Sequence, residues 1–280
     1  MLSKLEQEGY MLDADARRQE SARLYGALEA AVNGPLDRIN NCIEQIRSEI
    51  SGADPELVQR IGGLLTILED QALDLARLST SIGETALCCT GKMAPQGMVA
   101  DLSGQLASLV EMVQDYARRK GFELEFFSDG EALTVVDPVM LDRVVLNLLS
   151  NAMRHGRENG HVLVQLRAEG KGYCLSVTDD GFGIPARRQE HLTEMFGEAD
   201  EAFPGGTGLY LVDQFCQLMG WTLEWESGAQ GTRFSVHIPP VEPKDVLMLR
   251  SSPRCMPDLE QQRRRVRMEL LGQPDQGNGS

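Results

Sequence analysis

Two asparagines, Asn147 and Asn151, lie four residues apart within an otherwise apolar segment. A spacing of four places both amides on one face of a helix. On a half-buried face these amides need partners, and local hydrogen bonds are one way to satisfy them. The alternative is that their carbonyl oxygens bind a hard cation such as Mg²⁺, which prefers oxygen ligands and keeps several waters.

A second segment that could carry chemistry, VTDDGFGIP, begins at Val177. It places Asp179 at the end of a strand-like stretch, with Gly181 and Gly183 directly after it. Such a segment can be an ordinary turn. A carboxylate at a strand end can also accept a hydrogen bond from the exocyclic amine of a base, and nearby glycines allow the base to approach the backbone closely.

The third segment, FPGGTGL, runs directly into a helical pattern that begins near Leu209. Glycines before a helix leave backbone N–H groups free to bind phosphate, and the helix dipole favours the negative charge. The segment is not a P-loop, because no Gly-Lys-Ser/Thr follows it. A glycine cluster alone is weak evidence, so its meaning depends on the other two segments.

In this order and spacing, the three segments resemble the N, G1 and G2 boxes of the histidine-kinase ATP-binding domain, within the gyrase/histidine-kinase ATPase superfamily. The sequence DPVMLDRVVLNLLSNAMRHG resembles the N box almost throughout, HLTEMF (ending in Phe196) the F box, and GTRFSVHIP the last strand. The resemblance covers residues 97–240. It implies an α+β protein in which an antiparallel helical hairpin precedes a two-layer α/β-sandwich ATP-binding domain.

The resemblance implies ATP and Mg²⁺ as ligands. Asn151 would coordinate the Mg²⁺ that bridges the phosphates, and Asn147 would support it. Arg154 and His155 would lie near the phosphates or the ribose, and Asp179 would bind the adenine amino group. Gly181 and Gly183 would let the base approach, and Thr232 would help to hold it. Gly206 and Gly208 would hold the phosphate end of the lid, and Thr207 and Leu209 complete the nucleotide-binding positions.

The G2-like segment departs from the family pattern. Read forwards, it puts Tyr210 where the family has its last glycine. Read back from the helix, Gly206 and Gly208 become the last two glycines and Pro204 takes the first position. We prefer the second alignment because it keeps the helix in register.

The segment before it also departs in charge. It carries Glu198, Asp200 and Glu201, where the family usually offers Arg or Lys to phosphate. Carboxylates that face a polyphosphate should weaken the affinity for ATP.

The N-terminal third predicts a helical hairpin. Apolar residues recur at intervals of three or four from Tyr25 to Ile50, and again from Leu57 to Ile82, as in coiled coils and helical bundles. The turn SGADP between them puts Pro55 at the first position of the second helix. Neither helix can bury its whole seam on the other, which favours a homodimeric four-helix bundle over a hairpin packed on its own chain.

This hairpin resembles the dimerisation and phosphotransfer domain of the same family. There, the phosphoacceptor His is followed by an acidic residue and, five positions on, by a Pro before a Leu. Pro35 and Leu36 fit that pattern, and they put Ala30 at the acceptor position and Ala31 at the acidic one. Because alanine has no nucleophile to phosphorylate, the resemblance implies a chain that cannot autophosphorylate on His at this site.

Three functions stay open. The first is a nucleotide-binding, dimeric signalling protein of a two-component-type pathway whose hairpin docks a response regulator or another kinase. The second is an ATP-dependent kinase with its acceptor on a partner protein, as in the superfamily's anti-sigma-factor serine kinases. The third is a scaffold with a vestigial ATP site, which the acidic lid supports. We favour the first, since the long hairpin and the F-box-like segment count against the second.

Composition excludes other classes. The 280 residues carry 27 Lys+Arg and 42 Asp+Glu, a net charge of −15, which disfavours binding to nucleic acid. The sequence contains no apolar stretch of membrane-spanning length and no secretory signal, so we expect a cytoplasmic protein without membrane insertion. The six cysteines form no C-x-x-C pair and no Cys/His spacing suited to zinc, so free thiols are expected.

We expect three regions: a hairpin at 1–90, the ATP-binding domain at 91–240, and an Arg- and Pro-rich, partly disordered tail at 241–280 with a short helix near its arginines. Residues 87–100 are expected to be a linker. Glycine turns predict three β-hairpins, centred on Asp129-Gly130, on Gly170 and on the sequence GAQ at 228–230.

Overall fold

The computed structural model describes residues 32, 36, 38–48, 50, 55–194, 207–240 and 258–270. It describes only the backbone at positions 55, 56, 59, 66, 67, 69–71, 73, 74 and 207. The chain falls into two compact units, residues 1–94 and residues 95–280. Within the described residues, no helix is both long enough and apolar enough to cross a bilayer.

The described part of the first unit is helical at residues 38–48 and in α2 (Pro55–Cys89), and a turn follows α2. Part of the predicted apolar seam is buried, including Ile43 and Ala72. Other seam positions, such as Leu64 and Leu68, are exposed. The predicted linker begins too early, because α2 continues through Cys89 and a strand, β1 (Met98–Asp101), follows a short irregular stretch.

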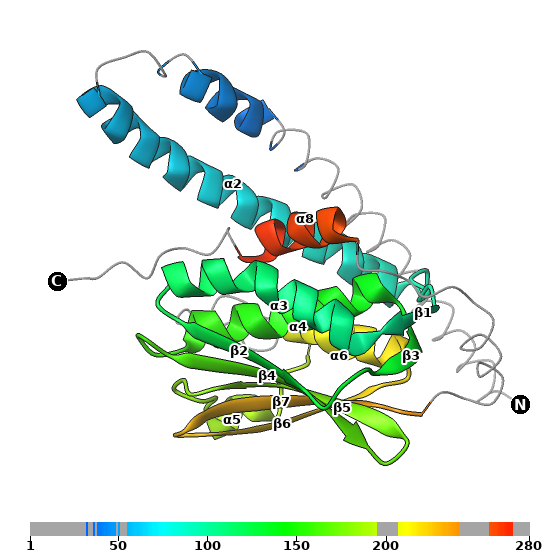
Figure 1. Ribbon diagram of the computed structural model, residues 1–280. Helices are drawn as coiled ribbons and strands as arrows, with labels where there is room; N and C mark the ends of the chain where they lie inside the picture. Colours follow the sequence, from blue (N-terminus) through cyan, green and yellow to red (C-terminus); the bar gives the residue numbers. More distant parts are fainter. Residues whose placement is uncertain are drawn as a thin grey trace, which may run out of the picture. The chain divides into compact units, whose positions relative to one another are not determined.

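The second unit is a two-layer α/β sandwich (Figure 1). Its main sheet has the strand order β2-β4-β5-β7-β6. The bounds are β2 (Glu123–Ser128), β4 (His161–Glu169), β5 (Gly172–Asp179), β6 (Thr222–Gly228) and β7 (Gly231–Ile238). The helices α3 (Leu102–Arg119), α4 (Pro138–His155) and α6 (Thr207–Leu218) cover one face, and the four-residue α5 (Ala186–Gln189) follows β5. We call the face turned away from α3, α4 and α6 the outer face.

Two of the three predicted hairpins are confirmed: β4 pairs with β5, and β6 with β7, in antiparallel register. The prediction of a hairpin at Asp129-Gly130 is wrong. Here β2 pairs in parallel with β4, whereas β3 (Leu133–Val136) pairs with β1 in a separate two-stranded sheet. Asp129 instead accepts a hydrogen bond from the backbone N–H of Ala168, 3.2 Å away, so the turn is fastened to β4 and sends the chain off the main sheet.

The helix α4 forms because of its ends and its apolar body. Asp137 caps it by accepting hydrogen bonds from the N–H groups of Val139 and Met140, and Pro138 occupies its first turn. Leu141, Val144, Val145 and Leu149 are fully buried on α4. Complete burial of such a side chain contributes about 1.5–3 kcal/mol to the free energy of unfolding. The packing of α4 therefore holds the polar side chains that it carries in fixed positions.

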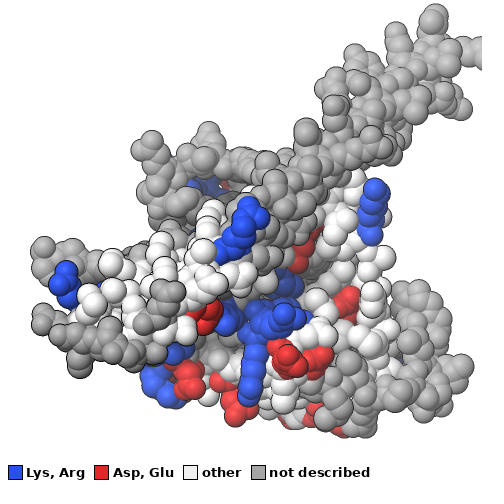
Figure 2. Space-filling view, turned by 90° about the horizontal axis from the view of Figure 1, so that it is seen from above, with Lys and Arg blue, Asp and Glu red and all other residues white. Residues whose placement is uncertain are grey.

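The short helix expected near the tail arginines is α8 (Leu259–Leu270), which packs on α3 and α4. Arg265 Nε lies 3.0 Å from Oδ2 of the fully buried Asp142, and Arg143 pairs with the buried Glu269 at 2.9 Å. Arg263, Arg264 and Arg267 are exposed. Basic and acidic side chains lie next to one another near the middle of the face in Figure 2.

Candidate functional site

The two asparagines of α4 have different surroundings. Asn147 is buried, its Nδ2 donates to the carbonyl oxygen of Arg143 at 2.8 Å, and its Oδ1 adjoins Gly208, where a Cβ would come within 3.0 Å. Asn151 Nδ2 is also buried, but no described residue bonds to it. Asn147 therefore makes a local hydrogen bond through its Nδ2. The buried Nδ2 of Asn151 has no partner among the described residues.

The last turn of α4 carries Arg154 and His155, as predicted. Loss of hydration, followed by the charges of Arg154 and Arg188, lowers the pKa of His155 to about 4. The residue is exposed, and the two guanidinium groups act in the same direction as desolvation. This end of α4 is therefore electropositive with a neutral imidazole at neutral pH.

Asp179 ends β5 and is held by the backbone. Its Oδ1 accepts hydrogen bonds from the N–H of Gly181 at 2.9 Å and of Thr232 at 3.3 Å. No described residue donates to Oδ2. Burial raises the pKa of Asp179, while the two backbone N–H groups act against that rise. The carboxylate thus has one oxygen fixed in place and one oxygen available as an acceptor.

The G1-like glycines are required by the backbone. Gly183 has φ of +72°, and a Cβ there would overlap the carbonyl oxygen of Gly228. A Cβ on Gly181 would lie 2.7 Å from Asp179 Oδ1 and 2.8 Å from the carbonyl oxygen of His155. The close approach at Gly181 joins the end of β5 to the end of α4, which brings the N-box-like and G1-like segments together.

A serine that the sequence reasoning missed ties this loop to the final hairpin. Ser227 Oγ accepts from the N–H of Ile184 at 2.7 Å and lies 2.8 Å from Thr232 Oγ1. Gln189 Nε2 donates to the carbonyl oxygen of Ile184 at 2.7 Å. The Thr232 hydroxyl, predicted to help hold the base, is therefore engaged with Ser227, while the Thr232 N–H positions Asp179.

Two further contributors were missed. Gly231 has φ of +121°, and a Cβ there would overlap the carbonyl oxygen of Asp179. Arg188, on α5, adds positive charge beside His155. The sequence offered a signal for each: Gly231 begins the last strand, and Arg188 belongs to an arginine pair just after the G1-like segment.

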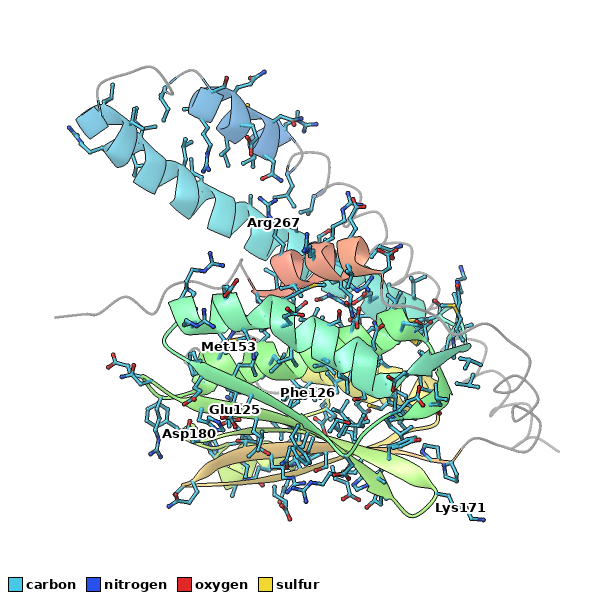
Figure 3. The ribbon with its side chains drawn as sticks, in the orientation of Figure 1. Glu125, Phe126, Met153, Lys171, Asp180 and Arg267 are labelled. Carbon is cyan, nitrogen blue, oxygen red and sulfur yellow. The ribbon has the colours of Figure 1, made fainter. Side chains whose placement is uncertain are left out.

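The predicted residues gather at one end of the sandwich. Figure 3 shows Met153, near the end of α4, and Asp180, just after β5, at the same end, whereas Lys171 lies at the opposite end. The first turn of α6 begins at Thr207 and holds Gly208 and the half-buried Leu209. The other predicted positions lie outside the described residues: Ala30, Ala31, Phe196, Glu198, Asp200, Glu201, Pro204 and Gly206.

The family model for histidine kinase-, DNA gyrase B- and HSP90-like ATPases matches residues 136–242, the segment that contains α4, Asp179 and the final hairpin. This domain belongs to that ATPase family. The relatives that match over this ATPase domain and the helices before it are histidine kinases. Domains of the family bind ATP, usually with Mg²⁺.

The chain is 28% identical over 256 residues to the circadian input-output histidine kinase CikA of Synechococcus elongatus, covering 86% of this chain and 34% of that kinase. It is 28% identical to the signal transduction kinase BarA of Escherichia coli K12, covering 85% of this chain and 27% of BarA. With the alginate biosynthesis sensor KinB of Pseudomonas aeruginosa it shares 35% identity, over 44% of this chain and 21% of KinB. The chain thus spans about a third or less of these relatives.

Two solved structures share the fold. Full-length ShkA in complex with AMPPNP aligns over 79% of this chain and 45% of ShkA, with a TM-score of 0.62 and 23% identity. The Acinetobacter baumannii histidine kinase AdeS aligns over 74% of this chain and 96% of that structure, with a TM-score of 0.53 and 16% identity. The predicted order, helices followed by a histidine-kinase-type ATP-binding sandwich, is confirmed.

Proposed function

We propose that this chain is an ATP-binding, histidine-kinase-like signalling protein of a two-component-type pathway that does not phosphorylate itself on His. The observation that carries the nucleotide part is Asp179. Backbone N–H groups of Gly181 and Thr232 hold its Oδ1, and Oδ2 stays available at the strand end. An acceptor oxygen held in this way suits the amino group of adenine.

The residues of α4 fit a Mg²⁺ ion. Mg²⁺ takes oxygen ligands and retains water, and the Asn151 amide offers one carbonyl oxygen. Its buried Nδ2, which has no described partner, is a donor and takes no part in binding the ion. Asn151 would hold the ion, and Asn147 would support it from one turn earlier. When bound, Mg²⁺ neutralises phosphate charge. The chain's own part is to keep the Asn151 amide aimed at that position through the buried body of α4.

The phosphates would lie between the last turn of α4 and the start of α6. Arg154 and Arg188 supply positive charge, and His155 stays neutral and can donate or accept a hydrogen bond. Thr207, Gly208 and Leu209 open the twelve-residue helix α6, whose N-terminal N–H groups favour an anion. We place Gly206 in the same role from the sequence resemblance.

We further propose that the output is nucleotide-dependent docking of a partner, a response regulator or another kinase, because Ala30 and Ala31 stand at the acceptor and acidic positions. The homodimer is supported by exposed leucines on α2. Leu57, Leu64, Leu68 and Leu75 are 45%, 63%, 49% and 47% exposed. Their spacing of seven, four and seven residues matches the seam of a helical bundle, so a second hairpin would bury them.

The nucleotide proposal is tested by calorimetric titration of the full chain with ATP and Mg²⁺. We expect binding in the micromolar to low-millimolar range and a loss of about 10- to 100-fold in Asp179→Asn, which removes a charged acceptor. Asp180→Asn is the matched control, because Asp180 is the exposed neighbour that bonds to the N–H of His161. No binding by the unaltered chain, or an equal loss in both variants, would overturn the proposal.

The missing acceptor is tested separately with ATP labelled on its γ-phosphate. We expect no label on the unaltered chain and acid-labile label on the double variant Ala30→His with Ala31→Glu. The variant Ala30→Gln with Ala31→Glu serves as the control. Acid-labile label on the unaltered chain would contradict the proposal.

A further inference from the structure

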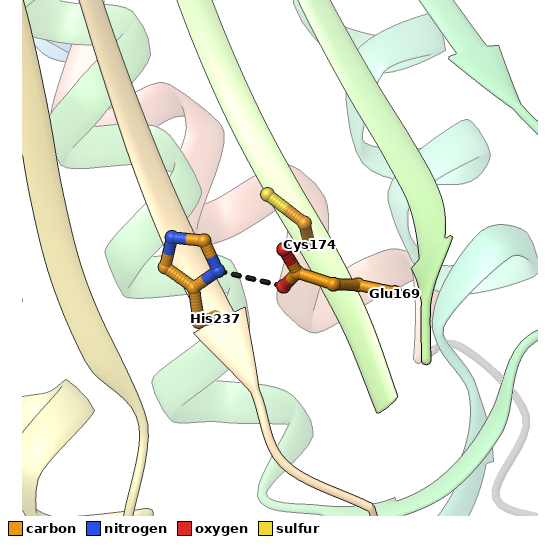
Figure 4. A group of neighbouring side chains, drawn as sticks. All are labelled: Glu169, Cys174 and His237. Atoms are coloured by element: carbon orange, nitrogen blue, oxygen red, sulfur yellow. Dashed lines mark hydrogen bonds and ion pairs between the residues drawn. The ribbon is translucent and has the colours of Figure 1, made fainter. Parts of the chain in front are cut away.

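Three side chains that can bind metals meet on the outer face of the sheet, away from the Asp179 end. Glu169 ends β4, Cys174 lies on β5, and His237 lies on β7. Cys174 and His237 are direct cross-strand neighbours. The carboxylate, thiol and imidazole atoms all lie within 4.8 Å of one another, and His237 Nδ1 lies 2.7 Å from Glu169 Oε2 (Figure 4).

We propose that Glu169, Cys174 and His237 form a binding site for a divalent transition-metal ion of the Zn²⁺ type. One thiolate, one imidazole and one carboxylate are the donors that zinc binds in tetrahedral sites, whereas Mg²⁺ and Ca²⁺ select oxygen. Zinc–ligand bonds of about 2.0–2.3 Å require donor atoms about 3–4 Å apart. The present spacing reaches that geometry with a small movement of Glu169, whose side chain is 55% exposed.

A carboxylate on a fourth strand, β6, lies next to the His237 imidazole. His237 Nε2 is buried and makes no hydrogen bond, but Glu224 Oε2 on β6 lies 3.3 Å from it. A histidine that binds a metal through one ring nitrogen usually directs the other N–H to a carboxylate, which sets the tautomer and the ring orientation. Glu224 is therefore a positioning residue, and Nδ1 is the nitrogen for the metal.

The neighbouring arginines do not neutralise the cluster by direct pairing. Arg167 lies opposite Cys174, yet its guanidinium lies over the Phe127 ring, 5.8 Å from the centroid. Arg233 Nη2 points to Ser176 Oγ at 3.4 Å. Two carboxylates instead face the His237 imidazole, Glu169 at 2.7 Å and Glu224 at 3.3 Å.

Room for a fourth ligand lies beside the cluster. A pocket of about 240 Å³ is lined by Glu169 and His237 together with Lys171 and Thr222, among others. Three protein ligands with one position left for water are a common zinc arrangement. Cys174 is five residues before Asp179 on β5, about 17 Å at the rise of an antiparallel strand. The cluster is therefore separate from the nucleotide end.

The test is titration of the full chain, first treated with a chelator and without nucleotide, with Zn²⁺ and with Co²⁺ as a spectroscopic replacement. We expect one equivalent of metal bound and a thiolate-to-cobalt charge-transfer absorption. Cys174→Ser should abolish the absorption, and His237→Gln should weaken the binding at least tenfold. Glu224→Gln should weaken binding less than His237→Gln while keeping the absorption.

Two matched controls make the result decisive. His161→Gln removes a histidine on the same face that lies 3.3 Å from Glu125 and belongs to no such cluster among the described residues. Cys88→Ser removes another thiol. Both should keep full affinity, and circular dichroism checks that Cys174→Ser folds, with Cys174→Ala as its replacement. No stoichiometric uptake, an absorption retained without Cys174, or equal losses in the controls would overturn the proposal.

Discussion

The two ends of β5 carry polar groups that are positioned in different ways. At the Asp179 end, a carboxylate is held by backbone N–H groups, and glycines with positive φ set the path of the chain. At the other end, Glu169 and His237 bond to each other through side chains that are 55% and 32% exposed.

This difference separates a preformed site from an adaptable one. Backbone donors do not change rotamer, so the Asp179 end needs no ligand to keep its geometry. Exposed side chains have alternative rotamers and gain little from one surface pair, so the fold holds the geometry of the Glu169 end less firmly than that of the Asp179 end. Substitutions should therefore act strongly on the first end and weakly, without metal, on the second.

The largest difference between the two ends of β5 is expected when one glycine is substituted at each end and ATP affinity is measured. Gly183→Ala forces a Cβ against the Gly228 carbonyl at φ of +72°, and we expect ATP binding to weaken by at least about 100-fold. Gly170→Ala, at the β4–β5 turn with φ of +60°, meets nothing within 4 Å. It should lower the free energy of unfolding by about 1–2 kcal/mol and leave the affinity for ATP unchanged in calorimetry.

A smaller effect is expected for Ser227→Ala. The change leaves the N–H of Ile184 without its partner and frees the Thr232 hydroxyl, at a cost of about 1–3 kcal/mol. Since Ser227 fastens the G1-like loop, ATP affinity should fall about tenfold. Ser235→Ala, on the outer face of β7, is the control. An unchanged affinity in Ser227→Ala would show that the loop holds its position without this serine.

The pH dependence of ATP binding tests whether Asp179 binds the adenine amino group. Burial raises its pKa, so the carboxylate takes up a proton at a higher pH than usual and loses its charge as the solution is acidified. We expect ATP affinity to decline as the solution is acidified, and Asp179→Asn to reduce this decline to the part that protonation of ATP itself causes. His155 contributes little near neutral pH because its pKa is lowered to about 4.

The smallest effect is expected for Glu169→Gln in the chelator-treated chain. An exposed pair of this kind contributes about 1 kcal/mol or less. Because the pKa of His237 is raised in the folded chain, this contribution is present below the unfolded pKa and disappears as pH rises through the folded one. Denaturant unfolding at acidic and alkaline pH measures it. A loss of several kcal/mol would show that the cluster is structural.

Prediction from the sequence was correct for local placement. Asn147 and Asn151 lie on one helix, α4, and Asp179 ends β5 before its glycines, because local periodicity and backbone freedom set both features. The prediction of a hairpin at Asp129-Gly130 failed, because a turn dipeptide does not determine which strand the next segment pairs with. It also missed Ser227, whose partners lie 43 and five residues away along the chain.

The described helices, most of the strands and the ATPase-type motifs could be predicted from the sequence, because each depends on spacing within a short stretch. The neighbours of distant side chains follow only from the tertiary structure. It placed Arg265 against Asp142 and brought Glu169, Cys174 and His237 together from three strands. Strand order and register set such contacts, and hydrogen bonds and packing between distant segments, rather than any local pattern, establish both.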